Sequence, residues 1–109
     1  MGPRLSKDAV FRDAAYFSGI VADDADADIT AHTRNVRAQI DKLLREVGSD
    51  ETKILQYQIF LASLKSFDAM NAVWDEWVAR GHTPPRATVE ARLANPKWLV
   101  QNVLSSAIC

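Results

Sequence analysis

The hydrophobic and polar residues of this chain change period several times, and the first pattern predicts a hairpin. Two short apolar stretches, Val10-Phe11 and residues 14–17, flank the polar pair Arg12-Asp13, and the second stretch ends at Ser18-Gly19. Short apolar runs bounded by polar residues and glycine are typical of strands. We therefore expect a strand, a tight turn and a second strand.

Two later segments have the spacing of amphipathic helices. The first is bounded by Asp28, at the position of an N-cap, and by Gly48, a natural stop. Its apolar positions are Ile29, Val36, Ile40, Leu43, Leu44 and Val47. The second helix is expected to begin near Lys65 or Ser66 and to close at Gly81, with an apolar stripe of Phe67, Met70, Val73, Trp74, Trp77 and Val78. We assign the two tryptophans of this stripe to core packing.

Three segments alternate with the period of a strand. Residues 53–62 place Leu55, Tyr57, Ile59 and Leu61 on one side. Residues 86–93 place Ala87, Val89, Ala91 and Leu93 on one side and Arg86, Thr88, Glu90 and Arg92 on the other. After a turn at Asn95-Pro96, residues 98–108 are predicted to form the last strand.

The resulting order, strand-strand-helix-strand-helix-strand-strand, indicates an α+β fold in which two helices cover one face of a sheet. If the turn at 94–97 pairs Leu93 with Trp98, the other face carries the polar side of residues 86–93 beside Leu99, Val103 and Ala107. A sheet face that carries both polar and apolar side chains, and that no helix of the same chain covers, suggests a partner chain. We expect an oligomer.

Composition narrows the class of protein. The 109 residues, 48% hydrophobic and 25% charged, suit a single globular domain over 1–109. Thirteen basic and fourteen acidic residues give a net charge of −1, which argues against nucleic-acid or membrane partners. No apolar run would span a bilayer, and residues 1–30 lack the features of a signal peptide. The single cysteine, Cys109, leaves no disulfide framework, so we expect a cytoplasmic protein.

Few side chains are arranged for chemistry. The two histidines, His32 and His82, have no cysteine or carboxylate at a metal-binding spacing, so we expect surface histidines and no metal site. Arg86 follows Pro84-Pro85, which hold the start of its strand. A fixed guanidinium suits bidentate capture of a carboxylate. A structural salt bridge, to Glu90 or to another chain, is an equally good interpretation.

With these elements in place, the chain resembles the RidA (YjgF) family of enamine/imine deaminases. The resemblance depends on the order and spacing of several motifs and covers nearly the whole chain from about Arg4. The matching segments are Tyr16-Phe17-Ser18-Gly19, Thr33-Arg34-Asn35-Val36, the Gly48 turn, Ile59-Phe60-Leu61, Phe67 with Met70-Asn71-Ala72-Val73-Trp74, and Pro85-Arg86-Ala87-Thr88-Val89-Glu90.

The resemblance implies a chorismate-mutase-like fold assembled as a homotrimer, with ligand clefts between subunits. It implies a hydrolase that converts 2-iminobutanoate or 2-iminopropanoate and their enamines to 2-oxo acids and ammonia, without a metal or organic cofactor. By the same resemblance Arg86 binds the substrate carboxylate, Ser18 and Gly19 line the cleft, and Thr88 is a site residue.

Two residues of the last strand depart from the family pattern. Gln101 stands where deaminases usually carry a glutamate that handles the water, and an amide cannot accept its proton at neutral pH. Asn102 replaces an apolar residue and is expected on the helix-covered face. Two hypotheses follow: a slow or specialised deaminase whose water Gln101 holds, or a non-catalytic trimer that binds small carboxylates. The net charge gives little support to the ribonuclease or translation-inhibitor role of some relatives.

Overall fold

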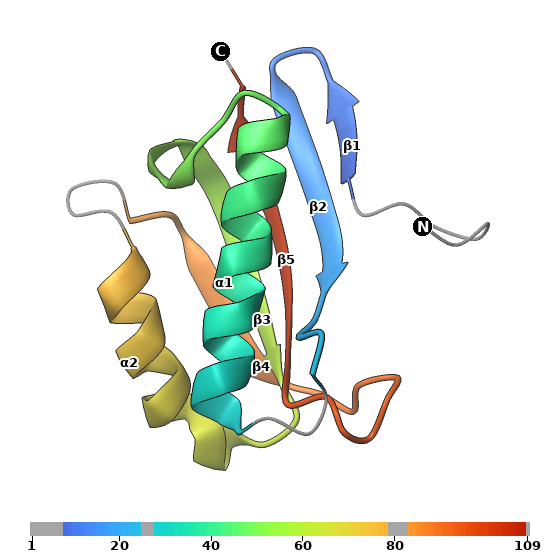
Figure 1. Cartoon of the computed structure of the whole chain (residues 1–109), viewed down its shortest axis with the longest axis vertical. Helices are drawn as coiled ribbons and strands as arrows, with labels where there is room; N and C mark the ends of the chain where they lie inside the picture. Colours follow the sequence, from blue (N-terminus) through green and yellow to red (C-terminus); the bar gives the residue numbers. More distant parts are fainter. Residues whose placement is uncertain (1–7, 25–27, 79–82, 109) are drawn as a thin grey trace.

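A computed structural model describes residues 8–24, 28–78 and 83–108, and it contains one five-stranded sheet and two α-helices (Figure 1). Two 3₁₀ turns, Glu51–Lys53 and Leu64–Ser66, precede the third strand and the second helix. Both helices lie on the same face of the sheet, so the predicted α+β layering is confirmed. In chain order the elements are β1 (Asp8–Phe11), β2 (Ala14–Ile20), α1 (Ile29–Glu46), β3 (Ile54–Leu61), α2 (Phe67–Trp77), β4 (Arg86–Glu90) and β5 (Val100–Ala107).

The ends of α1 follow the sequence signals. The Asp28 side chain accepts a hydrogen bond from the backbone N–H of Ala31 at 2.8 Å, which satisfies one N–H at the helix start. At the other end Gly48 has φ +79°, and the N–H of Ser49 reaches back to the carbonyl of Leu44 at 2.8 Å. The second helix ends at Trp77, before the predicted stop at Gly81, which lies outside the described residues.

The strand order is β1-β2-β5-β3-β4, and only the β3–β4 pair is parallel. The predicted hairpin between Leu93 and Trp98 is therefore wrong. The last strand instead lies in the middle of the sheet and pairs with β2 on one side and β3 on the other. Its buried side chains, among them Val100 and Leu104, are part of the core. This leaves β4 at the edge, and it ends at Glu90, three residues earlier than predicted.

The predicted face of β4 is also wrong. Arg86 is the register partner of Tyr57, and Thr88 that of Ile59. Tyr57 and Ile59 are buried beneath the helices, so Arg86 and Thr88 lie on the helix side. An edge strand tolerates an arginine there because the side chain extends along the rim of α2, where it stays partly exposed.

The opposite face, which we call the open face, has no helix over it. Val103 and Ala107 lie there as predicted. Within the described strands, the positions of this face carry no charged side chain; they are Ala9, Phe11, Ala14, Tyr16, Ser18, Gln56, Gln58, Phe60, Ala87, Val89, Gln101, Val103, Ser105 and Ala107. Tyr16 is 51% exposed and Val89 is 45% exposed, so this face presents apolar area to solvent.

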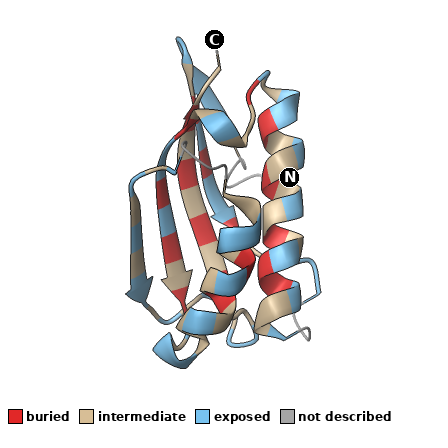
Figure 2. Ribbon diagram, turned by 90° about the vertical axis from the view of Figure 1, so that its left-hand side faces the viewer, coloured by how far each residue is buried: buried red, intermediate tan, exposed pale blue. Residues whose placement is uncertain are grey.

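The core lies between the sheet and the helices (Figure 2). Side chains along β5 alternate between buried and intermediate, as the period of two requires. Leu55 is half exposed, contrary to the predicted parity, because a register shift between Ile54 and Gln56 turns Ile54 inward instead. His32 is fully buried on α1, which corrects its assignment to the surface. Among the described helices, none is long and apolar enough to cross a membrane.

Candidate functional site

Arg86 opens β4, and its guanidinium has two defined contacts with α2. Nη1 donates a hydrogen bond to Oδ1 of Asn71 at 2.7 Å, and Cζ lies 5.0 Å from the ring centroid of Trp74. Asn71 and Trp74 are three residues apart and therefore share one face of α2. The helix thus holds the guanidinium at the edge of the sheet.

The structural salt bridge considered for Arg86 within the chain is not formed. Glu90 instead accepts a hydrogen bond from the backbone N–H of Leu64 at 2.9 Å. Arg34 and Arg37, by contrast, form ion pairs with Glu76 between the two helices. A guanidinium has five N–H donors, so Arg86 retains donors for an anion after its bond to Asn71.

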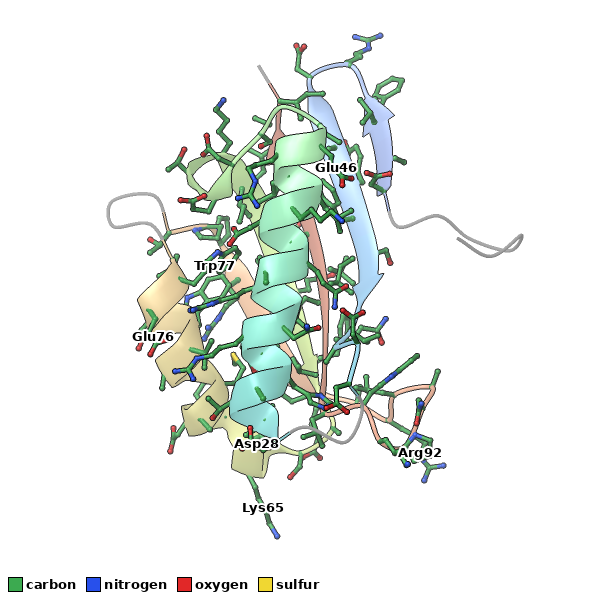
Figure 3. The ribbon with its side chains drawn as sticks, in the orientation of Figure 1. Asp28, Glu46, Lys65, Glu76, Trp77 and Arg92 are labelled. Atoms are coloured by element: carbon green, nitrogen blue, oxygen red, sulfur yellow. The ribbon has the colours of Figure 1, made fainter. Side chains whose placement is uncertain are left out.

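Behind the guanidinium lies a cluster of three aromatic rings. Tyr57 meets Trp74 edge-on, with ring centroids 4.7 Å apart, and Trp77 lies 5.6 Å from Trp74. Trp77 lies between the two helices, where its Nε1 donates to Asp41 at 2.9 Å (Figure 3). The assignment of both tryptophans to core packing is confirmed, but the contact of Trp74 with Arg86 was not anticipated.

Tyr57 joins this cluster to the centre of the sheet. Its hydroxyl accepts a hydrogen bond from Nδ2 of Asn102 at 2.6 Å, and both side chains are buried. Asn102 therefore lies on the helix-covered face, as predicted, although its Oδ1 has no hydrogen-bond partner. Burial raises the pKa of Tyr57 well above its ordinary value, so the phenol stays protonated at physiological pH.

Thr88 lies two residues beyond Arg86 on the same side of β4. Its Oγ1 is buried and makes no hydrogen bond. Buried hydroxyls normally have a partner, so this atom is an unused donor and acceptor on the same side of the strand as Arg86.

The remaining predicted site residues lie on the open face. Gly19 has φ +71°, and a Cβ added there would lie 3.5 Å from Nε2 of Gln101. Ser18 lines a hollow of about 470 Å³ with Tyr16, Gln58, Val103 and Ser105. Within one chain, the predicted site residues therefore lie on two faces of the sheet. Arg86 and Thr88 lie on the helix side of β4, whereas Ser18, Gly19 and Gln101 lie on the open face.

The structure adds Asn71, Trp74 and Tyr57 to the surroundings of Arg86. Asn71 belongs to a motif that matches the family, so it could have been singled out from the sequence. Trp74 and Tyr57 fit their apolar stripes, so no signal separated them from ordinary core residues. No group of three or more His, Cys, Asp or Glu side chains that could hold a metal ion occurs in the described ranges.

Comparison with known proteins places the chain in a family. The model of a family described as endoribonuclease L-PSP matches residues 4–103. A RutC family protein of Haemophilus ducreyi is 43% identical over 105 residues, which span 96% of this chain and 90% of that protein.

Solved structures agree with this relationship. A crystal structure of an uncharacterised protein from Pseudomonas aeruginosa superposes with a TM-score of 0.95 at 36% identity, covering 98% of this chain and 93% of that one. A YjgF family member from Neisseria meningitidis gives a TM-score of 0.93 at 39% identity, covering 98% and 89%. Sequence and fold thus agree over nearly the whole length, and the chain belongs to the YjgF/RutC (L-PSP) family.

Proposed function

We propose that this protein hydrolyses small 2-imino acids and their enamines, of the 2-iminopropanoate and 2-iminobutanoate class, to 2-oxo acids and ammonia. The observation that supports this most directly is the guanidinium of Arg86. It is partly exposed, has no carboxylate partner among the described residues, and is held by Asn71 and Trp74. A charge-assisted bidentate contact to a substrate carboxylate contributes about 1.5–3 kcal/mol when well formed.

The reaction needs little from the protein beyond orientation and proton transfer. Water adds to the carbon of the C=N bond, and the nitrogen takes up a proton. In the resulting carbinolamine the hydroxyl proton passes to the nitrogen, the C–N bond breaks to release ammonia, and the C=O bond forms. An imine is already electrophilic, so fixing its carboxylate places the carbon for attack. In this proposal the hydroxyl of Thr88 hydrogen-bonds the reacting end of the substrate.

The division of the site between two faces supports assembly. Arg86 lies at the edge of the sheet, whereas Gln101, Ser18 and Gly19 lie on the open face of the same chain. We propose a homotrimer in which the open face of one copy abuts the β4 edge of the next, so that one cleft receives residues from two chains. The uncharged surface of the open face suits burial against another protein.

Gln101 sets the limit on catalysis. An amide can hold a water by hydrogen bonding but cannot take its proton, and loss of a general base typically costs about 10²–10⁴ in rate. This residue therefore favours a second candidate, a trimer that binds small carboxylates without catalysis. The ribonuclease activity in the name of the family model is not favoured, because the net charge is −1 and the open face is uncharged.

The test follows pyruvate release from 2-aminoacrylate generated in situ. We expect release above the uncatalysed rate, abolished by Arg86→Ala and retained by the control Arg45→Ala, which removes an exposed arginine of α1. An inactive parent that gains activity with Gln101→Glu would establish the binding module instead. A parent that neither accelerates the reaction nor binds pyruvate contradicts both candidates. A solution mass near that of a 12.1 kDa monomer contradicts the shared cleft.

A further inference from the structure

The guanidinium of Arg86 has two contacts with α2. Its Cζ lies over the Trp74 ring, 5.0 Å from the ring centroid, and Nη1 donates one N–H to Asn71. A guanidinium binds a carboxylate through N–H groups that lie in its plane. The contact over the ring restrains the group, and the bond to Asn71 uses one of its five N–H donors, so donors are left for a ligand.

The Trp74 ring is itself held in place by Tyr57. The Tyr57 ring meets it edge-on at 73°, with centroids 4.7 Å apart, and the Tyr57 hydroxyl is anchored by Asn102 at 2.6 Å. The backbone N–H of Tyr57 also donates to the carbonyl of Pro85 at 3.0 Å, immediately before Arg86. One buried tyrosine therefore contacts both the indole and the strand that carries the arginine.

We propose that Trp74 is the positioning residue of the Arg86 carboxylate site, its fixed ring face holding the guanidinium in the orientation that binds the ligand. This inference rests on the proposed function, because it assigns the purpose of the arrangement to carboxylate binding. Without the indole, the bond to Asn71 remains but fixes the long arginine side chain less completely, so more rotamer freedom is lost at each binding event. That ordering cost corresponds to a loss of about three- to tenfold in affinity.

The binding test measures the pyruvate dissociation constant by NMR titration of the ¹⁵N-labelled protein. Trp74→Leu is expected to weaken binding about three- to tenfold, and Trp74→Phe, which restores an aromatic face, should recover part of the loss. Trp98→Leu is the matched control, since it removes a partly buried indole from the segment before β5 and leaves the Trp74–Arg86 contact. Equal weakening by the two leucine variants would overturn the inference.

A second measurement needs no ligand. The Nε–H resonance of Arg86, assigned by its loss in Arg86→Lys, should be displaced by the ring current of Trp74 in the parent and in Trp98→Leu. In Trp74→Leu it should move to the position of a solvent-exposed arginine. A resonance that stays in place refutes the positioning role. If the parent binds no pyruvate, the proposed function fails, and this ligand-free measurement still decides whether Trp74 orients Arg86.

Discussion

The buried pair of Tyr57 and Asn102 gives the most quantitative prediction. Tyr57 is 1% exposed and Asn102 is 4% exposed, so neither side chain can find water when its partner is removed. Tyr57→Phe leaves the whole Asn102 amide without a partner, and a buried polar group in that state costs about 1–3 kcal/mol. Asn102→Leu leaves the tyrosine hydroxyl alone at a similar cost, partly offset because the unpartnered Oδ1 also disappears.

The double variant Tyr57→Phe/Asn102→Leu removes all the polar atoms of the pair and retains similar volume. We expect it to be at least as stable as the parent, so the coupling energy between the two sites equals or exceeds the sum of the two single losses, at least about 2 kcal/mol. At about 4 °C for each kcal/mol in a domain of this size, each single variant should lower Tm by up to about 12 °C.

Urea unfolding followed by circular dichroism measures the four stabilities. All four are measured at one protein concentration, because the proposed assembly would contribute to stability. Two single variants with parental stability would contradict the reasoning. A double variant whose loss equals the sum of the singles would do so as well, because the two groups would then not be each other's partners.

Three further predictions concern single residues. Burial raises the pKa of Asp41, so the stability that comes from its protonated carboxyl is present below about pH 4 and is lost as the pH rises through the folded-state pKa. Asp41→Asn, which keeps an acceptor for Trp77, should therefore be more stable than the parent at pH 7 by urea unfolding. A stability difference between the two that persists at pH 3 would contradict this. Gly48→Ala should cost about 1–2 kcal/mol from the left-handed backbone alone, since an added Cβ meets no atom within 4 Å; Gly48→Asn should cost less, and equal losses would refute the backbone explanation. Asp28→Ala should destabilise by about 1 kcal/mol through loss of the helix cap, whereas Asp28→Ser should remain near the parent unless the cap contributes nothing.

Local signals predicted the elements that depend on neighbouring residues. The cap at Asp28 and the turn at Gly48 bound α1 because each acts through its own backbone or the adjacent turn. The hairpin around Arg12-Asp13 formed for the same reason, and β2 continued past Ser18-Gly19 to Ile20 through a bulge.

Local signals could not predict which strands pair or which side of a strand faces the helices. Alternation over residues 86–93 defines two sides but not which of them meets the helices. The apolar side of Ala87 and Val89 suggested burial, yet the parallel register with β3 turns Arg86 toward α2. The choice depends on β5 entering between β2 and β3, which is a contact between distant segments.

The candidate site also combines a feature that local sequence predicts with one that depends on distant contacts. Arg86 could be singled out from its prolines and from the family motif. Its orientation depends on Asn71 and Trp74, fifteen and twelve positions earlier in the chain, and helical periodicity already accounted for Trp74 without a second role.

If copies of the chain meet along β4 as proposed, the edge position of this strand makes ligand binding depend on the concentration of the protein. A second chain that packs along the exposed edge of β4 would also lie next to Arg86, the first residue of that strand. Diluting the protein until the copies separate should therefore weaken pyruvate retention even if every chain remains folded. Apparent affinities measured at nanomolar and millimolar chain concentrations would then differ, and the dilution curve would report the strength of self-association.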